Sequence, residues 1–135
     1  MARILIVEDE EQVRILAESY LREQGHQTLS AATMEQALAL LEVTKGVDLL
    51  FVDVGLYDDR HVGLDLAMQA VERAPGLRVL YTTGQAVTDG MKVLFVENSA
   101  ILPKPYTVEQ LQAILTVSFG IRPMIAPSSA QPKME

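Results

Sequence analysis

Five short strand-like runs alternate along this chain with stretches that have the periodicity of amphipathic helices, and this alternation constrains the fold most. Four of the runs are strongly apolar; the five cover residues 3–7, 27–31, 47–52, 77–82 and 100–102. A nearly continuous apolar run suits a strand that is covered on both faces, as in a parallel sheet. The sequence therefore predicts an α/β fold with one doubly wound, five-stranded parallel sheet and helices on both faces.

The stretches between the runs predict helices whose quality differs. Apolar residues recur at helical spacing in the first three and in the last, and Thr33 and Thr107 each open a capping box. Residues 85–97 should form the fourth helix, but their valines, threonine and Gly90 are weak helix formers. The expected buried stripes are Val13, Leu16, Ala17, Tyr20 and Leu21; Met34, Ala37, Leu38 and Leu41; Leu64, Ala67, Met68 and Val71; and Leu111, Ile114 and Leu115.

Length and charge bound the class of protein. The 135 residues are 49% hydrophobic and 21% charged, which is typical of one globular domain. We expect that domain over 1–119 and a flexible tail over 120–135, where prolines and serines replace the apolar period. The net charge of −7 disfavours contact with nucleic acid, and no apolar run is long enough for a membrane span. Without cysteine or a signal peptide, the chain is expected to be cytoplasmic.

Residues capable of chemistry follow the predicted strands. Glu8 and Asp9 come after the first, Asp53 ends the third, Thr83 follows the fourth and Lys104 follows the fifth. Because the carboxyl ends of parallel strands meet at one edge of the sheet, these side chains should lie together. Three carboxylates close together repel each other, and a divalent cation relieves that repulsion. Carboxylate and carbonyl oxygens are the ligands that Mg²⁺ prefers.

These residues, in this order, resemble those of response-regulator receiver domains, the family of the chemotaxis response regulator. The resemblance covers residues 2 to about 118 and implies a flavodoxin-like sheet with strand order 2-1-3-4-5. It implies that Asp53 accepts a phosphoryl group, with Thr83 and Lys104 binding the phosphoryl oxygens. It also implies a Mg²⁺ site formed by Glu8, Asp9, Asp53 and the carbonyl of Gly55. Such domains catalyse their own phosphorylation and usually their own slow dephosphorylation.

Two positions depart from the common pattern of that family. Many members carry an aromatic residue three positions before the lysine, where this chain has Ile101. A subclass with Phe-Ala-Thr-Gly at the end of strand four often lacks that aromatic, and residues 81–84 are similar to it. Gly55 stands where bulkier residues are common, which leaves that side of the site open.

Three functions were weighed. The leading one is a single-domain response regulator of a two-component or phosphorelay system, a monomer or weak dimer. Its partners would be a sensor histidine kinase or a histidine phosphotransfer protein, and a downstream protein target. The alternative is a phosphorylation-independent pseudo-receiver that only binds protein. A small enzyme or flavin carrier is disfavoured because no glycine-rich phosphate loop follows the first strand. Our hypothesis is that residues 85–97 form the segment that changes conformation on phosphorylation.

Overall fold

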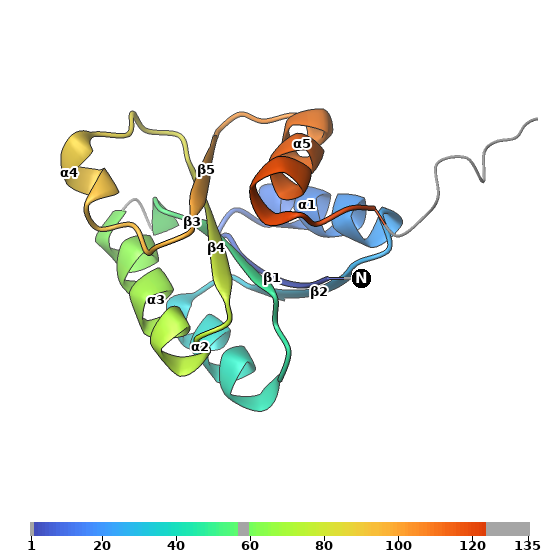
Figure 1. Cartoon of the computed structure of the whole chain (residues 1–135), viewed down its shortest axis with the longest axis horizontal. Helices are drawn as coiled ribbons and strands as arrows, with labels where there is room; N and C mark the ends of the chain where they lie inside the picture. The colour runs from blue at the N-terminus through green and yellow to red at the C-terminus, as the bar shows by residue number, and fades with distance from the viewer. Residues whose placement is uncertain (1, 57–59, 124–135) are drawn as a thin grey trace, which may run out of the picture.

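The computed structural model describes residues 2–56 and 60–123, which form alternating strands and helices (Figure 1). The strands are β1 (Arg3–Val7), β2 (Gln27–Ala31), β3 (Leu49–Asp53), β4 (Arg78–Thr83) and β5 (Ala100–Pro103). The helices are α1 (Glu11–Glu23), α2 (Met34–Val43), α3 (Arg60–Arg73), α4 (Asp89–Lys92) and α5 (Val108–Phe119). Every predicted strand is present, with its ends shifted by no more than two residues.

The strands form one sheet in the order β2-β1-β3-β4-β5, and all four pairings are parallel. This confirms the predicted fold class and strand order. In the register, Val7 pairs with Ala31 and with Val52, so β1, β2 and β3 end side by side. Asp53 pairs with Thr82 and Thr83 with Pro103, which continues the same edge through β4 and β5. The loops after these strands therefore open on one side of the molecule.

Alternate side chains of the central strands enter two separate cores. Leu5 and Val7 pack on the side of α2 and α3, whereas Ile4 and Ile6 pack on the side of α1 and α5. Figure 1 shows the same division, with α1 and α5 on one face of the sheet and α2 and α3 on the other. Strands buried on both faces need apolar residues at successive positions, which explains the continuous runs in the sequence.

Two predicted core positions are wrong. Leu16 is 61% exposed on α1 and Met68 is 48% exposed on α3. Both stand at the edge of the apolar stripe of their helix, where Ala17 and Ala67 take the positions facing the sheet. A helix on one face of a sheet buries only part of its circumference, so edge positions at helical spacing can stay in solvent.

The helix expected over residues 85–97 shrinks to the four residues of α4. Thr88 caps it by accepting a hydrogen bond from the Met91 N–H, and Gly90 lies inside it. Beyond α4 the Leu94 N–H bonds three residues back, to the carbonyl of Met91. The Phe95 N–H likewise bonds three residues back, to the carbonyl of Lys92, and the Val96 N–H bonds to the buried hydroxyl of Tyr81 at 3.0 Å instead of continuing a helix. Weak propensity and this outside acceptor together explain the short helix.

The two capping boxes differ. The Thr107 hydroxyl accepts from the Gln110 N–H, and the Gln110 side chain accepts from the Thr107 N–H, so this box is complete. At α2 the Thr33 hydroxyl accepts from the Gln36 N–H, but the Gln36 side chain reaches back to the Ala32 N–H. The box at α2 therefore differs from the prediction, because the Gln36 side chain bonds to the residue before Thr33 and not to Thr33 itself.

Of the expected tail, residues 120–123 belong to the described part of the chain, and Ile121 is buried against α1 and α5. Residues 124–135 lie outside it. Among the described helices, none has the length and apolarity that crossing a bilayer requires.

Candidate phosphoacceptor and metal site

The structure places the predicted site residues at one edge of the sheet. Glu8 and Asp9 directly follow β1, Asp53 is the last residue of β3, and Thr83 is the last of β4. Lys104 directly follows β5, and its N–H donates to the carbonyl of Thr83 at 2.9 Å. This edge carries residues that are up to 96 positions apart in the sequence, counted from Glu8 to Lys104.

Lys104 is the cation at the centre of the cluster. Its Nζ lies 2.7 Å from Oε1 of Glu8, 3.2 Å from Oδ2 of Asp53 and 3.5 Å from Oε1 of Glu10. Burial by itself would lower the pKa of Lys104, but the hydrogen bond to Glu8 and the charges of Asp53 and Glu8 outweigh it and raise the pKa. The ammonium therefore stays charged and is held over the carboxylates.

Glu8 is an acid whose charged form is disfavoured by its surroundings. Its side chain is almost fully buried, and its Oε2 accepts a hydrogen bond from the Glu10 N–H at 3.2 Å. Burial, together with the neighbouring negative charge of Asp53, raises the pKa of Glu8 to about 7, although the bond to Lys104 acts in the opposite direction. One ammonium does not neutralise several carboxylates, so the side chains of the cluster carry an excess of negative charge.

Asp53 is held at the end of β3 by both of its oxygens. Oδ1 accepts from the Gly55 N–H at 2.9 Å, and Oδ2 accepts from Lys104 at 3.2 Å. The residue is only 5% exposed, so it is almost completely withdrawn from solvent. A Cβ on Gly55 would lie 3.6 Å from Oδ1, an ordinary contact, so glycine leaves this side open without being required sterically.

Thr83 is buried, and its hydroxyl accepts from the Gln85 N–H at 3.1 Å. It therefore caps the turn that leaves β4, whereas α4 itself is capped by Thr88. The neighbouring Thr82 hydroxyl points to the other side and donates to the carbonyl of Leu102 at 2.7 Å. Thr83 is the last residue of β4 and its hydroxyl lies at the turn that follows the strand, whereas Thr82 pairs with Asp53 in the register of β3 and β4.

Sequence reasoning missed three residues beside the site. Gly63, in the first turn of α3, lies so close to β3 that an added Cβ would be 2.5 Å from the Asp53 carbonyl oxygen. Arg14 donates to the Glu8 carbonyl at 3.0 Å, and Glu10 pairs with Lys104. The signal for Gly63 was available, since a glycine inside an amphipathic helix pattern often marks a close approach.

The donor set suits a hard divalent cation. Glu8, Asp9 and Asp53 each offer a carboxylate oxygen, and these oxygens all lie within 4.8 Å of one another. Mg²⁺ takes oxygen ligands and usually keeps several waters, so one or two carboxylates in a partly open site are enough. The arrangement can hold a cation next to Asp53 and place a phosphoryl group between that cation and Lys104.

Comparisons with known proteins agree with this geometry. AlgB of Pseudomonas aeruginosa, an alginate biosynthesis transcriptional regulatory protein, is 31% identical over 126 residues, which are 92% of this chain and 27% of AlgB. A CheY-like receiver domain protein from Methanospirillum hungatei superposes with a TM-score of 0.75 at 26% identity, covering 86% of this chain and 91% of that one. NtrX from Brucella abortus superposes with a TM-score of 0.76 at 26% identity, covering 89% of this chain and 27% of NtrX.

This chain thus spans about a quarter of the length of AlgB and NtrX, and nearly all of the Methanospirillum domain. Residues 4–116 match the family of response regulator receiver domains, which includes every strand and most of the last helix. With that match, and with the acids, the threonine and the lysine at the expected strand ends, the chain belongs to the response regulator receiver domain family.

Proposed function

We propose that Asp53 is the residue that accepts a phosphoryl group, from the phosphohistidine of a sensor histidine kinase or of a histidine phosphotransfer protein. The observation that carries this proposal is the position of Lys104 Nζ, 3.2 Å from Asp53 Oδ2 within an otherwise acidic cluster. A lysine held there is placed to neutralise a phosphoryl group on Asp53. Receiver-family membership supports signalling by phosphorylation.

In the proposed reaction, an oxygen of Asp53 attacks the phosphorus of the phosphohistidine. The new P–O bond makes an acyl phosphate, the P–N bond breaks, and the imidazole of the donor leaves with its electron pair and takes up a proton. Lys104 pairs with the transferred oxygens, and the Thr83 hydroxyl binds one of them. Slow hydrolysis of the acyl phosphate by water, on the side left open by Gly55, would return the protein to its starting state.

Mg²⁺ is the cofactor we propose, held by Asp9, Asp53 and the Gly55 carbonyl, with Glu8 acting through a metal-bound water. When bound it supplies positive charge that screens the carboxylates and the incoming phosphoryl group. The residues fit it because they supply only oxygen ligands and an excess of negative charge. The chain's own contribution is to hold Asp53 still: Gly55 fixes one oxygen and Lys104 the other.

The described part of the chain is proposed to work by contact with proteins. Its output would pass through a downstream protein target or a phosphorelay in the cytoplasm, with the domain (1–119) acting as monomer or weak dimer. The net charge of −7 supports protein rather than nucleic acid as the partner of this domain. AlgB is named as a transcriptional regulatory protein, but three quarters of it lie beyond the matched region.

Phosphorylation would switch the segment of residues 85–97. The added charge and oxygens would enter at the sheet edge where β4 ends in Thr83, and the turn that Thr83 caps leads directly into this segment. Amide hydrogen exchange with and without a phosphoryl mimic tests the switch. We expect altered protection over 85–97; equal protection in both states contradicts it.

Intact-mass measurement after incubation with acetyl phosphate or phosphoramidate and Mg²⁺ tests the phosphoacceptor. We expect one added phosphoryl group, which disappears without Mg²⁺ and in Asp53→Asn. Asp48→Asn, at the opposite end of the same β3 region, is the matched control and should be phosphorylated normally. A folded protein that gains no phosphoryl group refutes the proposal and favours the pseudo-receiver.

A further inference from the structure

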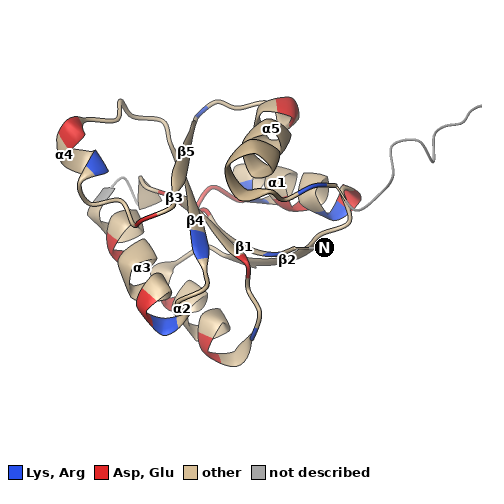
Figure 2. Cartoon of the chain, viewed as in Figure 1, with Lys and Arg blue, Asp and Glu red and all other residues tan. Residues whose placement is uncertain are grey.

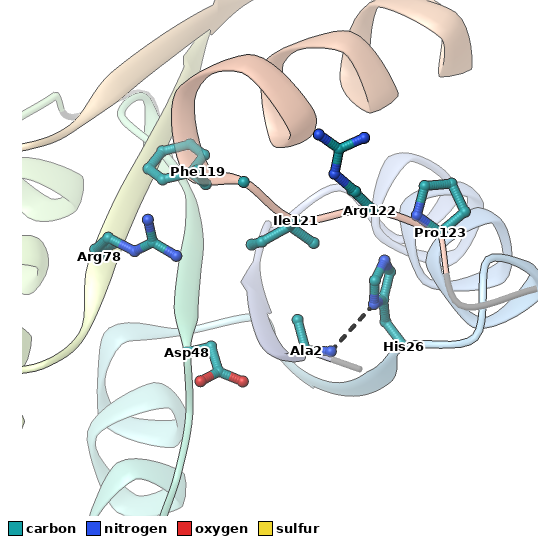
Figure 3. A pocket seen from close by; sticks show the side chains of 9 residues that line it. Ala2, His26, Asp48, Arg78, Phe119, Ile121, Arg122 and Pro123 are labelled. Atoms are coloured by element: carbon teal, nitrogen blue, oxygen red, sulfur yellow. Dashed lines mark hydrogen bonds between the residues drawn. The ribbon is translucent and has the colours of Figure 1, made fainter.

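A second concave site lies at the edge of the sheet where the strands begin, opposite the acidic cluster (Figure 3). Its volume is about 370 Å³. It is formed where β1 and β4 start, where the chain enters β2 and β3, and where it leaves α5. The residues that line it are Ala2, His26, Asp48, Arg78, Phe119, Gly120, Ile121, Arg122 and Pro123.

The charge of this cavity differs from that of the rest of the molecule. Acidic residues are found on all five helices (Figure 2), and the net charge is −7. The cavity instead has two arginines and one aspartate. Oδ2 of Asp48 already accepts a hydrogen bond from the Arg3 N–H at 2.8 Å, so part of its charge is directed to the backbone of β1. The lining therefore has an excess of positive charge and of hydrogen-bond donors.

The guanidinium of Arg78 is held in place by the ring of Phe119. Its guanidinium carbon lies 5.3 Å from the centre of the Phe119 ring, a cation–π contact between β4 and the end of α5. In Figure 3 this guanidinium extends into the cavity, while Arg122 stands at the rim, where the chain leaves α5. An arginine fixed in this way loses less conformational freedom when it binds a ligand.

His26 supplies a donor without an acceptor. It is 5% exposed, and its Nδ1 accepts a hydrogen bond from the Ala2 N–H at 3.2 Å. The neutral ring must then carry its proton on Nε2. Nε2 is buried and has no hydrogen-bond partner among the described residues. In Figure 3 that edge of the ring points toward Arg122 and Pro123, at the cavity mouth. A buried N–H without an acceptor is costly, and an oxygen entering beside residues 121–123 would satisfy it.

We propose that this cavity binds a small oxyanion, a carboxylate or phosphate group, through Arg78, Arg122 and the Nε2–H of His26. The three groups are donors only, and two of them carry a fixed charge, which matches the acceptor-only oxygens of such a ligand. The volume admits a small organic acid or a phosphate ester. This site is independent of the phosphorylation of Asp53, from which β3 separates it.

Nuclear magnetic resonance of the two histidine rings tests the site. The full-length protein is titrated with sodium phosphate in one series and sodium succinate in another, at constant ionic strength set by chloride. We expect the His26 ring resonances to shift and saturate in at least one series, which identifies the ligand class. His61, exposed on α3, is the internal control and should not follow the same curve.

Matched arginine variants decide whether the response belongs to the cavity. Arg122→Gln, at an exposed position unlike the partly buried Arg78, should raise Kd about tenfold, as expected for losing one charge-assisted hydrogen bond. Arg73→Gln removes an equal charge from the last residue of α3, on the opposite face of the sheet from α5, and should leave Kd unchanged. Absence of saturation in both series overturns the proposal. So does a Kd that is the same in Arg122→Gln and in the unaltered protein.

Discussion

Replacing Gly63 with alanine sets two effects of opposite sign against each other behind Asp53, the proposed phosphoacceptor. Alanine favours a helix interior over glycine by about 1 kcal/mol, so propensity alone predicts stabilisation. The added Cβ, however, would lie 2.5 Å from the Asp53 carbonyl oxygen and 2.7 Å from the Val54 Cα. Ordinary contact begins near 3.4 Å, so α3 has to retreat by about 0.9 Å or β3 has to bend.

Both clashing atoms are backbone atoms, one of the last residue of β3 and one of the residue that follows it. Both residues are buried, and the Val54 N–H is held by the carbonyl of Thr82, so neither moves cheaply. Overpacking of this kind costs typically 1–3 kcal/mol, and values near the upper end apply where backbone is displaced. We expect Gly63→Ala to lower the free energy of unfolding by about 1–2 kcal/mol net of the propensity gain. We also expect slower phosphorylation, because the residue that shifts is Asp53 itself.

Urea unfolding and the acetyl phosphate reaction measure the two effects separately. Gly76→Ala is the control, since nothing lies within 4 Å of its added Cβ and its backbone φ is not positive. It should leave both the stability and the rate nearly unchanged. A Gly63→Ala protein that is more stable than the unaltered chain, with an unchanged rate, would show that α3 has room to move and would refute the reasoning.

Three further outcomes are expected. The pKa of Glu8 is raised from 4.5 to about 7, so between these pH values the folded metal-free protein holds a proton that the unfolded chain releases. The free energy of unfolding should therefore fall as pH rises from 4.5 to about 7, and Glu8→Gln should flatten this fall in urea titrations. Mg²⁺ at roughly a hundred times its Kd should stabilise the protein by about 2.7 kcal/mol in thermal unfolding, an effect lost in Asp53→Asn. Tyr81→Phe should cost about 1 kcal/mol and speed amide exchange at Val96, whose N–H loses its acceptor.

The sheet could be predicted from the sequence because strands buried on both faces leave a strong local signal. The positions of the acids and of Lys104 followed from the rule that strand ends share an edge. The order of the strands did not follow from local pattern: it came from the family resemblance and was confirmed by the pairing. Periodicity also placed Leu16 in the core, because spacing alone does not say how much of a helix circumference the sheet covers.

Contacts between distant segments were beyond the sequence. The unpartnered Nε2 of His26 depends on how the end of α5 passes over the start of β1, and no local pattern encodes that arrangement. The charge balance around Lys104 could not be predicted from the sequence for the same reason. Each acid could be named, but the 2.7 Å approach to Glu8 and the pairing with Glu10 depend on how the loops after β1 and β5 fold over the site.

The aromatic side chain missing from position 101 has a counterpart on the neighbouring strand. Ile101 pairs with Tyr81 across β4 and β5, and Tyr81 is fully buried. Its ring stacks on Phe95 with centroids 4.3 Å apart, and its hydroxyl holds the Val96 N–H. The segment after α4 is thus tied to β4, two residues before Thr83, and we expect a movement at Thr83 to reach it through the strand itself. On this reasoning the connection does not depend on an aromatic side chain on β5.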